Sequence, residues 1–242
     1  QCLFEGNAAS SGGAVQLGDA ATAAFSDCVF ANNTALAVGG AVAVPPFRSL
    51  RPRSLASFTE ACCSSTAQTT DSGGALYLGS PLAASLQQVT LSGNAAVGQG
   101  GAAYVNANSV PVTLDGVTLV DNCAVGSGGA IYSRASTVTV TGGAVRGNFV
   151  GVTHASGEVG GRQDCTHRFT DRESALVAAA TSPVLGGGVY AVQGHLTVNT
   201  TVVEDNSAGA GGAVHCASCN LHIGGSTVQR NWAAASGGGV DS

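Results

Sequence analysis

Four residues near the end of the chain have the types and spacing of a metal site. His215, Cys216, Cys219 and His222 are close in sequence, and imidazole nitrogens and thiolates are the ligands that zinc prefers. His215 and Cys216 are consecutive residues of a strand-like stretch, so their side chains point to opposite faces and do not converge easily on one ion. A local disulfide between Cys216 and Cys219 is therefore the favoured interpretation, and no metal site is predicted.

Acidic side chains raise a second possibility, the processing of polysaccharides. Such enzymes use two or three carboxylates as acid and base, or carboxylates with calcium and an arginine. The outward-facing acids Asp121 and Asp205 are expected to lie three repeats apart, whereas a catalytic pair needs adjacent repeats. The densest group, Asp164 with His167 and Asp171, lies in a long irregular segment. We predict no catalytic residue, and a polysaccharide lyase or glycoside hydrolase is the alternative function.

These residues are carried by a repeat that covers nearly the whole chain. A Gly-Gly pair, followed by a small and then an apolar residue, recurs with an underlying period of about 27 residues. A fixed period of roughly 20–50 residues is typical of a solenoid, in which one unit stacks on copies of itself. The copies are GGAV at 12–15 and 39–42, GGAL at 73–76, GGAA at 100–103, GGAI at 128–131, GGGV at 186–189, GGAV at 211–214 and GGGV at 237–240.

Each repeat contains three short strand-like stretches. The first ends in an asparagine shortly before the glycines, the second begins at the glycines, and the third precedes the next repeat. All are rich in β-formers, are bounded by turn residues and lack a helical period. They predict an all-β fold, a right-handed parallel β-helix of about eight coils with three strands each. Stacked amides of the asparagine column can hydrogen-bond from coil to coil, and its members are Asn7, Asn33, Asn94, Asn122, Asn148, Asn206 and Asn231.

Alternation along the second strand divides its side chains between the interior and the surface. The last residue of each glycine motif, from Val15 to Val240, is apolar and must point inward. The next residue points outward, above a floor of alanine and glycine that we expect to be flat. Such an exposed aromatic row suits a flat ligand, a glycan or a neighbouring chain, while packing between the rings is the competing explanation. The row contains Tyr77, Tyr104, Tyr132 and Tyr190, and His215 continues it.

The asparagine and glycine motifs together resemble the repeat of the chlamydial polymorphic outer-membrane proteins, whose signature is FxxN followed by GGAI. Phe4-x-x-Asn7 and Phe30-x-x-Asn33 match the first half in full, and GGAI at 128–131 matches the second. This resemblance implies a β-helical, surface-exposed stalk associated with adhesion. It implies no catalytic residue and no cofactor.

Cysteine content and charge indicate where such a protein works. Eight cysteines are many for a reducing compartment, and N-glycosylation sequons begin at Asn32 and Asn199. A net charge of −5 argues against nucleic acid as a partner, and no apolar run reaches the roughly 18 residues of a membrane span. We expect an extracellular or cell-surface location. The expected partners are flanking repeats, other surface proteins and glycans.

Two insertions interrupt the period, at residues 45–53 and 149–185. The first is a short arginine-rich excursion. The second is charged, and a capping box predicts a short helix over 171–180 within it. Apart from these insertions we expect residues 1–242 to form one solenoid segment of a longer repeat protein, because the chain lacks methionine and begins inside a repeat.

Two further disulfides are expected from the stacking of the coils. Cys165 is the only cysteine of the larger insertion, and Cys123 lies in the equivalent turn one coil earlier, so we predict that they are bonded. Cys2, Cys28 and Cys62 are expected to share an inward column, where neighbouring coils can be bridged. We assign this segment a structural or adhesive function.

Overall fold

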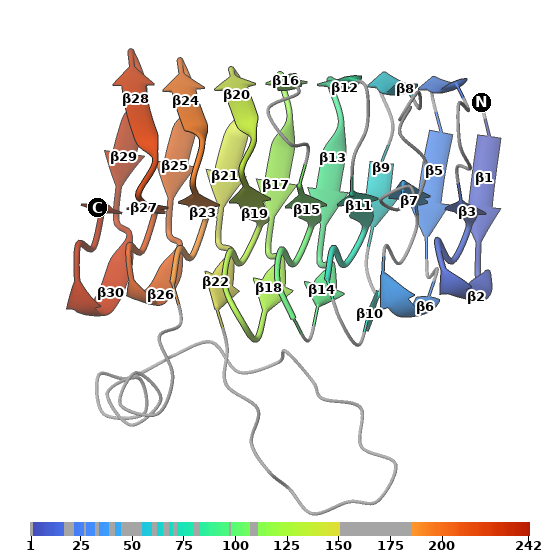
Figure 1. The fold of residues 1–242 in the computed structure, drawn as a ribbon, viewed down its shortest axis with the longest axis horizontal. Helices are drawn as coiled ribbons and strands as arrows, with labels where there is room; N and C mark the ends of the chain where they lie inside the picture. The colour runs from blue at the N-terminus through green and yellow to red at the C-terminus, as the bar shows by residue number, and fades with distance from the viewer. Residues whose placement is uncertain are drawn as a thin grey trace, which may run out of the picture.

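A computed structural model gives the fold of the chain (Figure 1). Every regular element among the described residues is a β-strand, and all strand pairs are parallel, so the predicted all-β parallel solenoid is confirmed. The two termini lie at opposite ends of a rod. The structure describes residues 2–16, 22–26, 28–31, 34–38, 42–44, 55–59, 62–64, 68–69, 72–79, 83–96, 98–106, 111–150 and 185–242.

The strands form four sheets, which run along the four sides of the rod. Sheet A contains β1 (Cys2–Glu5), β5 (Cys28–Ala31), β9 (Cys62–Ser64), β13 (Thr90–Ser92), β17 (Thr118–Val120), β21 (Ala144–Arg146), β25 (Val202–Glu204) and β29 (Thr227–Gln229). Sheet B contains β2 (Ala8–Ser11), β6 (Thr34–Val38), β10 (Gln68–Thr69), β14 (Ala95–Ala96), β18 (Cys123–Ala124), β22 (Phe149–Val150), β26 (Ser207–Ala210) and β30 (Trp232–Ser236).

The other two sheets complete each coil. Sheet C contains β3 (Val15–Gln16), β7 (Val42–Val44), β11 (Leu76–Leu78), β15 (Ala103–Val105), β19 (Ile131–Arg134), β23 (Val189–Val192), β27 (Val214–Ala217) and β31 (Val240–Asp241). Sheet D contains β4 (Thr22–Ser26), β8 (Leu55–Thr59), β12 (Ala83–Gln87), β16 (Pro111–Asp115), β20 (Thr137–Thr141), β24 (His195–Asn199) and β28 (Asn220–Gly224).

The prediction of three strands per coil is therefore wrong, because a fourth strand follows each asparagine. Sheet B supplies it, and in the middle of the rod its members are only two residues long, such as β14 and β18. Segments this short and rich in alanine carry no strand periodicity of their own. They pair because the strands on either side already hold the coils in register.

Single residues in the left-handed conformation turn the chain at the corners. The coil that contains β24 to β27 has Thr200, Asp205, Gly211 and Ser218 at φ values of 47°, 56°, 62° and 51°. The corner before sheet B is thus formed by the residue that precedes the asparagine, not by the asparagine itself. Such corners are sharp enough to separate strands of two to five residues.

The two glycines of the repeat serve different purposes, as one copy illustrates. Gly128 adopts a φ of +70°, which only glycine enters without strain. Gly129 has an ordinary φ, but an added Cβ would overlap the carbonyl oxygen of Gly187 on the next coil. The first glycine therefore makes the corner, and the second allows successive coils to approach.

From Asn94 to Asn231 the asparagine column forms a ladder of hydrogen-bonded amides, as predicted. Asn7 is exposed, and Asn33 lies outside the described residues. Asn148 Oδ1 accepts hydrogen bonds from the backbone N and the Nδ2 of Asn122, both at 2.9 Å. Asn148 Nδ2 donates to Leu119 O at 2.9 Å and to Asn206 Oδ1 at 3.0 Å. The same pattern joins Asn94 to Asn122 and Asn206 to Asn231. Asn122, Asn148 and Asn206 are fully buried, so these bonds form where water cannot replace them.

A narrow apolar core fills the interior beside this ladder. Inward residues of sheets A, C and D are in contact there, and the predicted inward column of sheet C is buried between Val42 and Val214. At the end of the rod Val240 is 39% exposed. The largest fully buried side chains are Leu76, Leu78, Leu86, Leu91, Leu119, Ile131, Leu196, Val42 and Val89.

The larger insertion is shorter at both ends than predicted. Phe149 and Val150 form β22 of sheet B, and Leu185 pairs with Ser127 and Ala210 through isolated bridges. Residues 151–184 lie outside the described part of the chain, as do the insertion at 45–53 and the helix expected at 171–180.

We predict that Asn148→Ala destabilises the rod by at least about 2 kcal/mol. The change leaves a buried backbone N–H and a buried amide of Asn122 without their acceptor, and each such group costs about 1–3 kcal/mol. Urea unfolding followed by circular dichroism measures the effect. Asn220→Ala is the matched control, because Asn220 is exposed on sheet D. Equal unfolding midpoints for the two variants would contradict the structural role of the ladder.

Candidate functional site

The four tyrosines form one continuous stack with His215 along sheet C. The five residues occupy equivalent positions on successive strands of the sheet, in the order Tyr77, Tyr104, Tyr132, Tyr190 and His215. Successive ring centroids are 4.9, 5.2, 5.1 and 5.3 Å apart. The first two pairs are parallel to within 3°, and Tyr132 and Tyr190 are tilted by 30°. We call these five residues the aromatic ladder.

The expectation that the whole row is exposed is wrong. Tyr104 and Tyr132 are only 9% and 7% exposed, while Tyr77, Tyr190 and His215 are partly exposed. Each internal ring has a neighbour on both faces, so stacking removes most of its surface from water.

The flat floor expected beneath the row is also absent from the surface of the described residues. Ala75, Ala102 and Ala130 are fully buried members of the core, because the chain has not yet entered the strand at these positions and strict alternation does not apply. The ladder therefore combines a packed centre with two more accessible ends.

Burial favours the neutral form of Tyr132 and Tyr190. Desolvation raises the pKa of Tyr190, and it is also the main cause of the raised pKa of Tyr132. Tyr104 and Tyr190 raise the pKa of Tyr132 further, and the charge of Arg134 and a hydrogen bond with Gln99 oppose the increase. The ladder resists the loss of its phenolic protons because a tyrosinate would be poorly solvated there.

At its C-terminal end the ladder meets a carboxylate. His215 Nδ1 lies 2.8 Å from Asp241 Oδ2, on the neighbouring strand β31. The side chains of both residues are partly exposed. The two side chains are within ion-pair distance, but His215 Nδ1 makes no hydrogen bond among the described residues.

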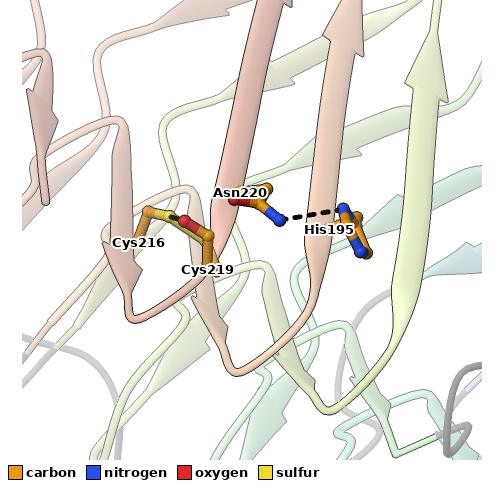
Figure 2. Close-up of a disulfide and its surroundings, with 4 residues drawn as sticks. All are labelled: His195, Cys216, Cys219 and Asn220. Atoms are coloured by element: carbon orange, nitrogen blue, oxygen red, sulfur yellow. Dashed lines mark hydrogen bonds between the residues drawn. A yellow bond between two sulfur atoms is a disulfide. The ribbon is translucent and has the colours of Figure 1, made fainter.

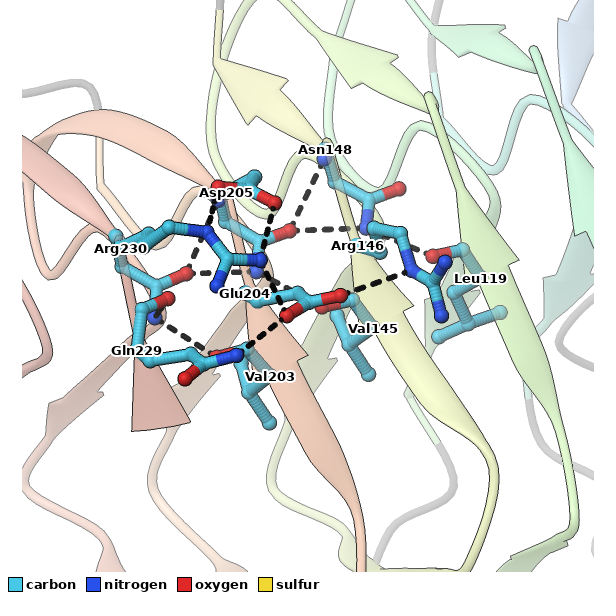
Figure 3. Close-up of polar contacts among 11 residues, drawn as sticks. Leu119, Val145, Arg146, Asn148, Val203, Glu204, Asp205, Gln229 and Arg230 are labelled. Atoms are coloured by element: carbon cyan, nitrogen blue, oxygen red, sulfur yellow. Dashed lines mark hydrogen bonds and ion pairs between the residues drawn. The ribbon is translucent and has the colours of Figure 1, made fainter. Parts of the chain in front are cut away.

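Sheet A carries a network of charges on the outer surface (Figure 3). Glu204 lies between Arg146 at 3.3 Å and Arg230 at 2.6 Å, and it accepts a hydrogen bond from Gln229 at 2.8 Å. Arg230 also binds both carboxylate oxygens of Asp205, at 2.9 and 3.0 Å. Bidentate pairing of this kind fixes the geometry of both side chains.

The charge network favours the ionised form of Glu204. The hydrogen bond from Gln229 is the main cause of a lowered pKa at Glu204, and the charges of Arg230 and Arg146 add to it against a desolvation penalty. Contacts with Asp205 and Glu204 raise the pKa of Arg230 above its already high ordinary value. A carboxylate so paired is a poor general acid, since its proton is bound too weakly at neutral pH.

The two outward acids are closer together along the rod than predicted. Asp121 and Asp205 occupy the left-handed corners before Asn122 and Asn206, and the intervening coil has Gly147 there, so they lie two coils apart rather than three. The constellation Asp164, His167 and Asp171 lies outside the described residues.

A disulfide joins Cys216 and Cys219 across the corner at Ser218 (Figure 2). Their Cα atoms are 5.4 Å apart, which is within the range of disulfides. His195 and Asn220 contact each other at 3.3 Å on the neighbouring strands, at an exposed position. Within the described ranges no group of histidine, cysteine and acidic residues is arranged to hold a metal ion.

The other cysteine predictions have different outcomes. Cys123 is disulfide-bonded, but Cys165 lies outside the described residues, so their pairing stays a prediction. Cys2 is a free and exposed thiol, so the proposed bridge between Cys2 and Cys28 is wrong for this structure. The two residues are in register on parallel strands, and side chains about 4.8 Å apart exceed the usual disulfide Cβ separation of about 3.8 Å. Cys62 does not share their column, because it pairs with Val29.

One of the two glycosylation sequons can be placed. Asn199 ends β24 on sheet D, is partly exposed, and lies opposite Gly224 on β28. Asn32 lies outside the described residues.

Sequence reasoning missed the charge network of sheet A. Arg146, Glu204 and Gln229 each stand two residues before an asparagine of the ladder and are neighbours in register. Alignment of the repeats on the asparagine would have found them, because the column then reads Val120, Arg146, Glu204, Gln229. The contact between Gln99 and Tyr132 had no such signal, since it depends on the turn before β15.

Comparison with known protein families finds a match within one repeat of the chain. Residues 116–134, which contain β17, β18 and the GGAI motif, match the repeat of the Chlamydia polymorphic membrane proteins. With the solenoid fold, this match supports the resemblance inferred from FxxN and GGAI. No curated protein and no solved structure matches the chain.

We predict that the tyrosines of the folded chain lose their protons at higher pH than those of the unfolded chain. Because the folded pKa of Tyr132 and Tyr190 is raised above the ordinary value of 10.0, the ladder contributes stability that is complete below that pH and is lost as pH rises through the folded pKa. Ultraviolet titration of tyrosinate reports on the ladder alone, since it holds every tyrosine of the chain.

A control variant tests the origin of that shift. Tyr132→Phe removes a phenol whose pKa is raised and keeps its ring in the stack, so the remaining titration should on average move toward the ordinary value. Identical titration curves for the folded and unfolded wild-type chain would show that the rings are not buried in a stack.

Proposed function

We propose that this solenoid is a structural and adhesive segment of a large cell-surface or extracellular protein. The observation that carries the proposal is the parallel pairing of successive strands in all four sheets along the rod. A rod stiffened by a buried amide ladder can hold a binding surface at a distance from the point where the protein is anchored.

Several features of the chain favour the surface of a cell. The matched repeat belongs to a family of membrane proteins, and the structure contains disulfide-bonded cysteines, which persist in oxidising compartments. Asn199, the sequon asparagine on sheet D, is partly exposed, and its amide lies over Gly224 of the neighbouring strand. In the described part of the chain no helix is long and apolar enough to cross a membrane.

The polysaccharide-processing alternative gains no support from the described acids. Glu204 and Asp205 are paired with arginines, and Asp121 lies two coils from Asp205. Enzymes of that class need carboxylates that converge on one sugar and are free to exchange protons.

Surface location is tested by adding protease to intact cells of the native source. We expect cleavage of the chain without permeabilisation, together with an oxidised Cys216–Cys219 pair when thiols are trapped before lysis. A chain that is protected until the cells are opened, and that carries free thiols at Cys216 and Cys219, would contradict the proposal.

Adhesion is tested at the accessible ends of the aromatic ladder. Tyr77→Ser combined with Tyr190→Ser should weaken binding to immobilised glycans or to cell surfaces by at least about tenfold, because exposed aromatic contacts often dominate such interfaces. Arg146→Gln on sheet A is the control and should leave binding unchanged. An equal loss in both variants, or none in either, would remove the ladder from the adhesive surface and leave only its packing role.

A further inference from the structure

We propose that the aromatic ladder is a site of oxidative tyrosine cross-linking, in which Tyr104 couples with Tyr77 or Tyr132 to form dityrosine. This modification is distinct from ligand binding and does not depend on it. It rests on the geometry of the stack.

The parallel pairs are arranged as the coupling reaction requires. Tyr77 and Tyr104 are 4.9 Å apart at 3° between their planes, and Tyr104 and Tyr132 are 5.2 Å apart at 3°. Because the residues are in register on neighbouring strands, successive rings lie next to each other with nearly parallel planes. The unpaired electron of a phenoxyl radical occupies orbitals perpendicular to the ring, so two stacked radicals meet along the direction in which the new bond forms.

The reaction balances with one peroxide. Each of two tyrosines loses one electron and its phenolic proton, and the two radicals form one C–C bond between ring carbons adjacent to the hydroxyl-bearing carbons. The hydrogen on each bonded carbon then moves to the oxygen and restores two phenols. Hydrogen peroxide, acting through a haem peroxidase, accepts the two electrons and two protons and becomes two molecules of water.

The ladder also offers a route for the electrons. Tyr77 and Tyr190 are partly exposed, whereas Tyr104 and Tyr132 are nearly buried, so an oxidant reaches the ends first. Ring contacts near 5 Å connect the ends to the centre without a gap. The resulting bond joins neighbouring coils covalently, which would reinforce the rod under oxidising conditions.

The test is oxidation of the full chain with hydrogen peroxide and a haem peroxidase, at a dilution where chains do not meet. We expect dityrosine fluorescence in monomers, the loss of two hydrogens per cross-link, and peptides that link Tyr104 to Tyr77 or Tyr132. The yield should exceed that of the urea-unfolded chain by about tenfold, since the folded chain holds the rings together.

Two matched variants locate the reaction within the ladder. Tyr104→Phe removes both parallel pairs and leaves only the pair tilted by 30°, so it should lose most of the dityrosine. Tyr190→Phe keeps both parallel pairs and should retain most of it. Circular dichroism checks that each variant is folded. Equal losses in the two folded variants, dityrosine found only between chains, or a native yield no higher than that of the unfolded chain would overturn the proposal.

Discussion

The stacking of one coil on the next in strict register is the constraint on which the rest of this structure depends. The buried asparagine ladder enforces it, because each amide binds the equivalent amide and backbone of the adjacent coil. A shift of one residue would leave these groups unpaired in the interior, and each would cost about 1–3 kcal/mol. The same register brings the tyrosines face to face and sets the charges of sheet A opposite one another. By fixing the register, the ladder of amides therefore determines which side chains are neighbours on the outer surface.

Much of the fold could be predicted from the sequence because the same pattern of glycines and asparagines recurs in successive repeats. The glycine pairs and asparagines gave the period, the parallel pairing and the inward column of sheet C, and they placed the amide ladder correctly. The fourth strand could not be found, since segments such as Ala95–Ala96 have no pattern and form strands only between ordered neighbours. The sequence also did not identify the corner residues: the residue before each asparagine of the ladder, such as Asp205, adopts the left-handed conformation.

The residues that make up the candidate site could be predicted from the sequence, but the exposed surface of each side chain could not. Alternation identified the tyrosine column correctly, and the structure brings all four rings and His215 into contact. Alternation says nothing of how much surface each ring keeps, because that depends on stacking. The error over Cys2 had a similar origin: sharing a column brings two side chains near each other, but it does not bring the sulfur atoms into bonding geometry.

The most direct test of the coil-on-coil register is a contact between residues far apart in sequence. The side-chain amides of Asn148 and Asn206 are separated by 58 residues and joined by a hydrogen bond of 3.0 Å. Nuclear Overhauser measurements on the labelled chain should show a strong cross-peak between these two amide groups, and another between the amides of Asn122 and Asn148. If Asn148 instead showed contacts only to residues near it in sequence, the parallel stacking of the coils would be contradicted.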